Sequence, residues 1–162
     1  SAPPKVVAAA LVVPQGLLDQ LDGAAAHPAE PHADPMETDR RAVAAVMAAE
    51  RALGRNPTSQ AHANPGFDIE SVDPETGIHY FIEVKGHLPR TEEISVSATQ
   101  VQKAKSNPDR WRLAVASVPD DPKATPTVRY LVEPFANVTL HFAQTKVPLA
   151  VKNLLAESSA PC

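Results

Sequence analysis

Apolar and ionisable residues alternate most clearly in two short segments near the middle of the chain. Residues 66–70 read Gly-Phe-Asp-Ile-Glu, and residues 80–86 read Tyr-Phe-Ile-Glu-Val-Lys-Gly. Alternation with a period of two predicts strands that have one buried face and one exposed face. The segment between them contains Asp73, Pro74 and Gly77, which favour a tight turn. The pattern therefore predicts an antiparallel β-hairpin.

The length of the turn decides which residues of the hairpin face each other. A four-residue turn at 74–77 pairs Asp73 with Ile78, Val72 with His79 and, if the ladder continues without a bulge, Asp68 with Glu83. The apolar side chains then share one face and the ionisable ones share the other. The apolar set is Phe67, Ile69, Ile82 and Val84, and the ionisable set is Asp68, Glu70, Glu83 and Lys85. Such a face can hold a divalent metal, but an ordinary hairpin with a solvated charged face has the same pattern.

A helix is predicted over residues 35–53. Asp34 is a suitable N-cap, Pro35 suits the first helical position, and Gly54 favours termination. Apolar residues recur at helical spacing from Val43 onwards. The helix therefore has one apolar stripe that faces a core.

Glu50 lies on that stripe, two turns after Val43. Burying an isolated carboxylate costs several kcal/mol unless it is paired or bound to a metal. Glu50 is therefore a candidate functional acid. The alternative is a glutamate at the edge of the stripe that reaches water or pairs with Arg51 or Arg55.

The remaining predicted elements are shorter. We expect strands at 5–13, 94–96, 111–118, 127–132 and 138–142, helices at 97–105 and 148–157, a short helix or turn at 15–21, a linker at 23–35 and a loop at 55–65. Trp111 opens an apolar strand and is expected to be a core residue rather than a platform for base stacking.

These residues carry a resemblance to a known family. A helix with Glu50, then Gly-Phe-Asp-Ile-Glu, then Phe-Ile-Glu-Val-Lys-Gly, resembles the PD-(D/E)XK nuclease-like superfamily. More closely, residues 37–118 are similar to the domain of unknown function DUF3883, also called the NOV C-terminal domain, which is found at the ends of bacterial helicase-related proteins.

The resemblance implies an α/β (α+β) restriction-endonuclease-like core. Its order is a helix, an antiparallel three-stranded meander, a second helix and a further strand, in a mixed sheet flanked by helices. Residues 35–118 correspond to this core. Residues 1–34 are expected to form an N-terminal strand and a Pro/Ala-rich linker, and residues 119–162 are expected to add strands and a terminal helix that pack on the core.

The resemblance also implies residue roles. Asp68 and Glu83 correspond to metal ligands, Lys85 to the group that orients or activates the attacking water, and Glu50 to an auxiliary acid. Mg²⁺ or Mn²⁺ is the implied cofactor, since Mg²⁺ prefers hard oxygen ligands and typically takes only one or two carboxylates. Glu70 is a further candidate auxiliary acid.

Gln100 has two interpretations. Some nucleases of the superfamily have a catalytic Gln at this place, but Ala104 stands where the accompanying Tyr is expected. Ser97-Ala98-Thr99-Gln100 also has the pattern of a capping box, in which Gln100 only closes the start of a helix.

Composition sets outer limits on the function. The chain has 162 residues, 17 prolines and a formal net charge of -4. Its length predicts one modest hydrophobic core. Its negative net charge is not typical of a nucleic-acid-binding protein. Basic residues gather after Lys85, among them the candidate DNA contacts Arg90, Lys103 and Lys105, although a solvated helix face has the same pattern.

The compartment and the wider context are also predicted from composition. The single cysteine, Cys162, excludes an internal disulfide and a Cys-based zinc site, which favours a cytoplasmic protein. The chain lacks a run of the roughly 20 apolar residues that would cross a membrane. It begins with Ser, which indicates a fragment of a longer polypeptide, and its Ala, Pro and Arg content is typical of a GC-rich bacterial gene.

Together with these patterns, the resemblance implies a metal-dependent DNA nuclease domain of a larger helicase-related bacterial protein, with a role in DNA restriction, defence or repair. Its expected partners are DNA and the helicase or ATPase region of the same parent chain. The alternative is a non-catalytic module of the same fold that docks nucleic acid or protein.

Overall fold

Helix α2 (Pro35–Ala52) begins and ends as its sequence predicts. The computed structural model describes residues 34–60 and 66–162. At the start of α2 the Asp34 carboxylate accepts a hydrogen bond from the Met36 N–H at 3.0 Å. Just after its end Gly54 has a φ of +80°, a backbone conformation that glycine adopts without steric cost. The strand at 5–13, the helix at 15–21 and most of the linker at 23–35 lie outside the described residues.

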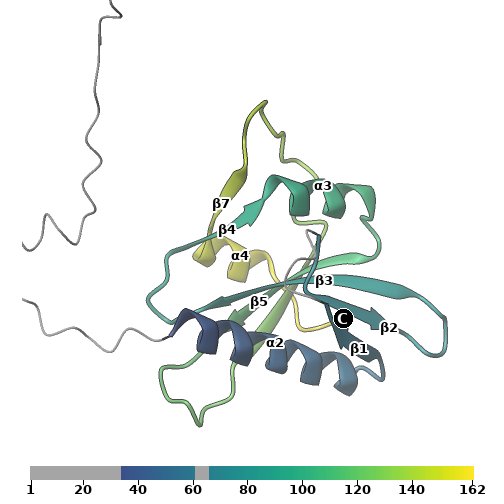
Figure 1. The fold of residues 1–162 in the computed structure, drawn as a ribbon, viewed down its shortest axis with the longest axis vertical. Coiled ribbons are helices and arrows are strands. Elements are labelled where there is room, and N and C mark those ends of the chain that lie inside the picture. The colour runs from purple at the N-terminus through teal and green to yellow at the C-terminus, as the bar shows by residue number, and fades with distance from the viewer. Residues whose placement is uncertain (1–33, 61–65) are drawn as a thin grey trace, which may run out of the picture. The chain divides into compact units, whose positions relative to one another are not determined.

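A five-stranded mixed sheet forms the centre of the fold (Figure 1). Its order is β1-β2-β3-β5-β6. The strands are β1 (Asn56–Ser59), β2 (Ile69–Val72), β3 (His79–His87), β5 (Trp111–Ser117) and β6 (Thr127–Val132). β3 and β5 are parallel, and the other neighbouring pairs are antiparallel. The predicted architecture of a mixed sheet flanked by helices is therefore confirmed.

The β2–β3 hairpin has the predicted register over most of its length. Val72 is paired with His79 and Ile69 with Ile82. The predicted continuation to an Asp68–Glu83 pair is wrong, because β2 begins at Ile69 and the Asp68 N–H donates to the Ile82 carbonyl at 2.9 Å. Asp68 and Ile69 thus both face Ile82, which is the arrangement of a β-bulge.

The three-stranded antiparallel meander was predicted to consist of the two hairpin strands and a strand at 94–96, and this is wrong. It consists of β1, β2 and β3, whereas residues 56–59 were expected to lie in a loop. The predicted third strand, β4 (Glu93–Ser97), instead pairs with β7 (Lys146–Ala150) in a separate two-stranded sheet. Pairing with β2 makes a strand of the polar segment Asn56–Ser59, which has no strand pattern of its own.

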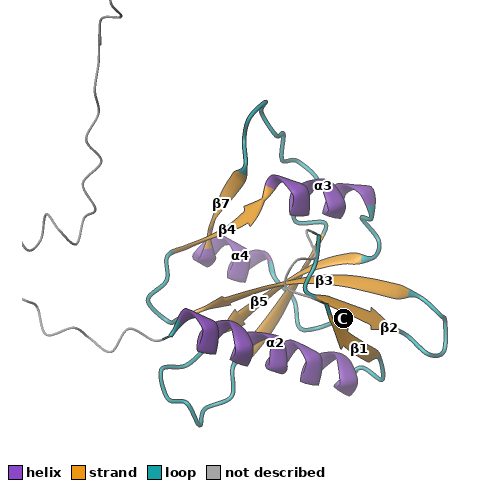
Figure 2. Ribbon diagram, viewed as in Figure 1, coloured by secondary structure: helices purple, strands orange, loops and turns teal. Residues whose placement is uncertain are grey.

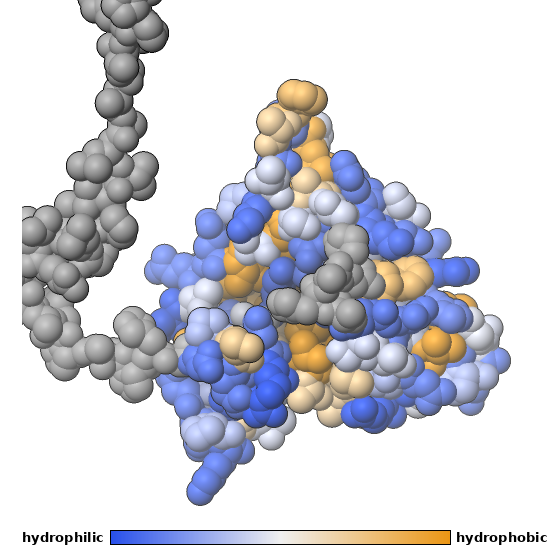
Figure 3. Space-filling view, in the orientation of Figure 1, coloured by the Kyte–Doolittle hydropathy of each residue, from blue (hydrophilic) through white to orange (hydrophobic). Residues whose placement is uncertain are grey.

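The C-terminal third also departs from the expected elements. Residues 148–150 belong to β7, so α4 (Val151–Glu157) is shorter than the predicted helix. Pro148 is accommodated because β7 is bonded only to β4, and proline is tolerated on an edge strand. The strand predicted at 138–142 is wrong: this segment lies in a loop with an apolar tip (Figure 3), where Phe142 is fully exposed.

Two hydrophobic clusters hold helices on opposite faces of the five-stranded sheet (Figure 2). α2 covers one face with residues such as Ala42 and Val46. α3 (Ala98–Ser106), α4 and the β4–β7 sheet cover the other face. The interior strand β5 contributes to both clusters, with Trp111, Leu113 and Val115 on the α3 side and Ala114 and Ala116 on the α2 side. Trp111 is a core residue, as predicted, with 1% exposure.

α2 approaches β3 most closely at Gly86. A Cβ atom at Gly86 would lie 2.8 Å from the Ala42 Cβ and 3.3 Å from the Thr38 carbonyl oxygen. We therefore expect Gly86→Ala to lower the free energy of unfolding by about 1–3 kcal/mol, because overpacking moves the helix. Urea denaturation measures this change. Ala42→Gly removes one clashing atom, so the double variant should lose less than the sum of the two single variants. Additive losses would contradict the contact as the cause.

Candidate functional site

The candidate site lies along the part of β3 that extends beyond its pairing with β2. β3 extends to His87, but β2 pairs with it only as far as Ile82. In this part of β3, which β2 does not cover, the Val84 N–H donates to Asp68 Oδ2 at 2.8 Å. A side-chain carboxylate thus takes the place that a strand carbonyl would have, and the bulge places Asp68 beside Glu83.

Glu83 is buried with only part of its carboxylate paired. It is 2% exposed. Its Oε1 accepts a hydrogen bond from Gln100 Nε2 at 2.5 Å and lies 2.9 Å from the Lys85 Nζ. Its Oε2 has no hydrogen-bond partner within residues 34–60 and 66–162. A buried carboxylate oxygen without a partner is costly, and a bound cation is one way to satisfy it.

Burial raises the pKa of Glu83 to about 7, against an ordinary value of 4.5. The Lys85 ammonium opposes this by stabilising the ionised form, and the nearby Asp68 carboxylate adds to the rise. The protein without metal therefore holds Glu83 largely protonated in mildly acidic solution.

The raised pKa predicts a stability that falls with increasing pH. Between pH 4.5 and about pH 7 the unfolded chain has lost the Glu83 proton but the folded protein still binds it, so the free energy of unfolding decreases through this interval. At 1.36 kcal/mol per pKa unit the loss is on the order of 3 kcal/mol. Denaturation of wild type and Glu83→Gln between pH 4.5 and pH 8 measures it. The variant should lack this component, and parallel curves would contradict the assignment.

Asp68, Glu83, Lys85 and Gln100 line one cavity of about 310 Å³. The other lining residues are Asp39, Val43, Val84 and Gly86. The structure thus brings together four of the predicted site residues, from the β2–β3 hairpin and from α3. Gln100 also forms the predicted capping box with Ser97. Its main-chain N–H donates to the Ser97 Oγ and its side-chain Oε1 accepts from the Ser97 N–H, while its Nε2 donates to Glu83.

Asp39 is a lining residue that the sequence reasoning missed. It is an exposed acid on α2, one turn before Val43. The relevant signal was present, because residues four apart on a helix share a face. It adds a third carboxylate to the lining of the cavity.

The donor set fits a hard divalent cation. In the described part of the chain there is no cluster of three or more His, Cys, Asp or Glu that would cage a metal. Asp68 and Glu83 supply carboxylate oxygens, and the unpartnered Glu83 Oε2 is the observation that favours a cation here. Mg²⁺ commonly binds through one or two carboxylates and keeps several waters.

Glu50 lies elsewhere. It is fully buried, accepts a hydrogen bond from the Tyr130 hydroxyl at 2.7 Å, and pairs with Arg55 at 3.3 Å. Burial, followed by the contact with Glu50, raises the pKa of Tyr130. Glu50 does not line the cavity of Asp68 and Glu83. The pairing with Arg55 agrees with the alternative interpretation, although Glu50 is buried and does not reach water at the edge of the stripe.

The other predicted residues are dispersed. Glu70 pairs with His79 at 2.7 Å on the surface of the hairpin. Lys103 lies over the rings of Phe67 and Phe81. Arg90 lines a wide hollow of about 820 Å³ beside β7 and α4. Lys105 lines a third cavity.

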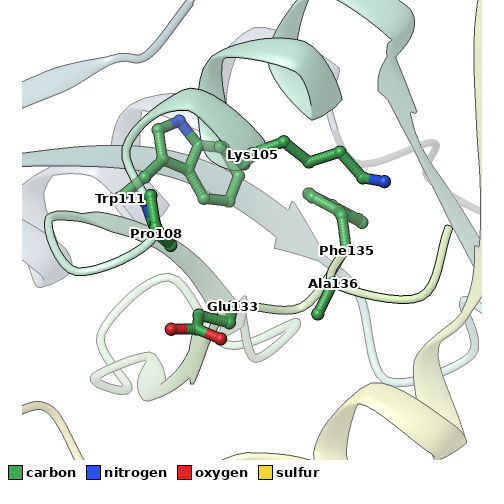
Figure 4. A pocket seen from close by; sticks show the side chains of 7 residues that line it. Lys105, Pro108, Trp111, Glu133, Phe135 and Ala136 are labelled. Atoms are coloured by element: carbon green, nitrogen blue, oxygen red, sulfur yellow. The ribbon is translucent and has the colours of Figure 1, made fainter.

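That third cavity is mostly apolar and has a volume of about 270 Å³. Figure 4 shows Trp111 and Pro108 on one side of it and Phe135 and Ala136 on the other, with Lys105 and Glu133 also in the lining. None of its lining residues is shared with the cavity of Asp68 and Glu83.

Comparison with known proteins identifies the family. The model of the family described as "Protein NO VEIN, C-terminal" matches residues 38–131, which is more than half of the chain. The chain belongs to this family. The family match spans α2, the hairpin, α3 and β5, and so includes every residue that lines the cavity of Asp68 and Glu83. The comparison with curated proteins gave no match.

Among solved structures, the chain is similar to the Holliday junction resolvase Hjc of Archaeoglobus fulgidus, an archaeal hyperthermophile. The sequences are 16% identical, the match covers 70% of this chain and 88% of the resolvase, and the TM-score is 0.44. This level of similarity is too low to transfer residue roles. Within the described residues, no helix combines the length and apolar character needed to span a bilayer.

Proposed function

We propose that this domain is a metal-dependent DNA nuclease. The observation that carries the proposal is the Glu83 carboxylate, which is buried beside Asp68 and has one oxygen without a partner in the described structure. Its other oxygen is held by Lys85 and Gln100. A carboxylate fixed in this way, at the wall of a cavity, is suited to hold a cation that in turn binds a phosphate oxygen.

In this proposal Asp68 and Glu83 hold Mg²⁺ or Mn²⁺. A bound metal ion lowers the pKa of a coordinated water and neutralises charge that develops on the phosphoryl oxygens. Asp68 is oriented by the Val84 N–H, and Glu83 by Lys85 and Gln100. Both acids therefore need little reorganisation when the cation binds.

Lys85 is assigned to the attacking water. It lies two residues after Glu83 on the same face of β3 and lines the same cavity. Its ammonium group can hydrogen-bond the water and stabilise negative charge at the phosphate. Because it also favours the ionised form of Glu83, its loss should weaken metal binding at neutral pH as well.

Lys85→Met tests this role. We expect cleavage of supercoiled plasmid with Mg²⁺ or Mn²⁺ to fall about 100-fold or more, and the remaining activity to need a higher pH because the pKa of Glu83 rises further. Nicking rates from pH 6 to pH 9 measure both effects, with Lys123→Met, a change in an exposed loop, as the control. Equal rates in wild type and Lys85→Met would contradict the assignment.

The wider setting belongs to the same proposal. The resemblance to domains at the ends of bacterial helicase-related proteins supports a helicase or ATPase region in the same parent chain, and a role in restriction, defence or repair. Such a region would supply much of the affinity for DNA, because this chain has a net charge of -4.

A docking module is the second candidate, and the mostly apolar cavity that Trp111 and Phe135 help to line favours it. In that case Asp68→Asn should leave partner binding intact. In the nuclease it should remove cleavage.

A further inference from the structure

Aromatic side chains form a row of two contacting pairs on neighbouring strands, from the core towards the candidate site. The chain has four Phe, one Trp and two Tyr, and four of these seven take part in the row. Phe67 and Phe81 have ring centroids 4.7 Å apart, Phe81 is paired with Trp111 across β3 and β5, and Trp111 lies 5.6 Å from Phe135. Trp111 and Phe135 are buried, whereas Phe67 and Phe81 are partly exposed.

Phe67 departs from its predicted face. The alternation of the sequence placed it on one face with Ile69 and Ile82, a face that α2 covers in the structure. It instead packs on Phe81, which contacts the cluster on the α3 side of the sheet. The bulge at Asp68 explains this, because an extra residue in a strand reverses the alternation of side chains before it.

The exposed end of the row adjoins the acids. Phe67 directly precedes Asp68 in the chain. Phe81 lies two residues before Glu83 on the same strand face, a separation of roughly 7 Å. A phosphate held at Asp68 and Glu83 would therefore have its neighbouring nucleotide within reach of these rings.

A cation accompanies the rings. The Lys103 Nζ lies 5.9 Å from the centroid of Phe67 and 5.6 Å from that of Phe81. The aliphatic part of Lys103 is close to Gly66, where an added Cβ would lie 3.2 Å from its Cγ. Lys103 is thus held at the rings by packing, with its ammonium group near both of them.

We propose that Phe67, Phe81 and Lys103 form a stacking platform for an unpaired nucleobase next to the scissile phosphate. The substrate class is then single-stranded or locally splayed DNA, since a base within a duplex has both faces covered by its neighbours. Aromatic rings beside a basic side chain are a general means of binding single strands. The inference rests on the proposed nuclease function for the position of the phosphate.

The test uses a single-stranded oligonucleotide that contains 2-aminopurine, whose fluorescence is quenched on stacking. Ca²⁺ replaces Mg²⁺ in all samples, so that the strand is not cut while Asp68 and Glu83 still hold a cation. We expect the fluorescence to be quenched when Phe67 is present and also in Phe67→Tyr. In Phe67→Leu most of the quenching should be lost, and the affinity for the single strand should be about 5- to 50-fold weaker. Phe142→Leu, a change at the exposed loop tip, should have no effect.

Affinity for a blunt duplex and the melting temperature are measured on the same variants as controls for substrate class and for folding. Both should change little in Phe67→Leu. Equal quenching and affinity in Phe67→Leu and wild type would overturn the platform, as would equal losses for single strand and duplex. The two proposals fail separately: metal-dependent cleavage by wild type without stacking removes only the platform, whereas stacking without cleavage removes only the nuclease.

Discussion

Replacing Glu83 with glutamine is expected to reduce metal-dependent DNA cleavage about 100-fold or more while the domain stays folded. Groups that merely orient metal ligands commonly contribute 10- to 100-fold to affinity or activity, and a ligand should contribute at least as much. The amide keeps an oxygen that can accept from Gln100 and Lys85, as Glu83 Oε1 does. It lacks the negative charge that a cation needs.

The same substitution should not lower stability at pH 8, because it removes a buried charge that is costly there. Plasmid nicking and thermal melting on the same preparations measure the two effects. Glu75→Gln, in the exposed turn of the hairpin, makes the same chemical change away from the cavity and should act as wild type. Full activity in Glu83→Gln would contradict the role of Glu83, and an unfolded variant would contradict the stability argument.

Glu50→Ala is expected to lower the free energy of unfolding by about 3–5 kcal/mol. The substitution leaves the Tyr130 hydroxyl and the nearly buried Arg55 without their carboxylate partner. Arg55 also stacks on the Tyr80 ring at 3.9 Å and donates to the Cys162 carbonyl at 3.0 Å. Loss of Glu50 therefore weakens contacts that join α2 to β6, to β3 and to the C-terminal residue.

Urea denaturation provides the comparison, with Glu37→Ala as the matched control. Glu37 pairs with Arg40 on the exposed side of the same helix, and an exposed pair is worth roughly 0–1 kcal/mol. Similar small losses in both variants would contradict a buried network. Glu50→Gln separates structure from catalysis: a well-folded variant that has lost cleavage would support the auxiliary-acid role implied by the family resemblance.

Features that depend on neighbouring residues could be predicted from sequence. The Asp34 cap, the Ser97–Gln100 capping box and the turn between Val72 and His79 each involve residues within a few positions of one another. Local turn chemistry and side-chain hydrogen bonds decide such features. The predicted hairpin brought Asp68 to the same region as Glu83 and Lys85, but the bulge, and not the predicted pairing, places it beside Glu83.

Features that depend on distant partners could not be predicted in this way. β1 and β7 are strands because they pair with β2 and β4. Each contains a proline, and neither has a clear alternation of apolar and polar residues. Glu50 was recognised as an acid on a core-facing stripe, but its partner Tyr130 is 80 residues away in the chain. The bulge at Asp68 is a local feature that alternation alone does not reveal, and it moved Phe67 to the other face.

Calorimetric titration of Mn²⁺ into wild type and Glu83→Gln at pH 8 tests the metal site most directly. The titration is done with the free domain and with bound oligonucleotide, since phosphate oxygens can complete the coordination. We predict a binding heat in wild type that is lost in Glu83→Gln and retained in Glu75→Gln. Equal heats in wild type and Glu83→Gln, or no heat in wild type with DNA present, would contradict a cation held by Glu83.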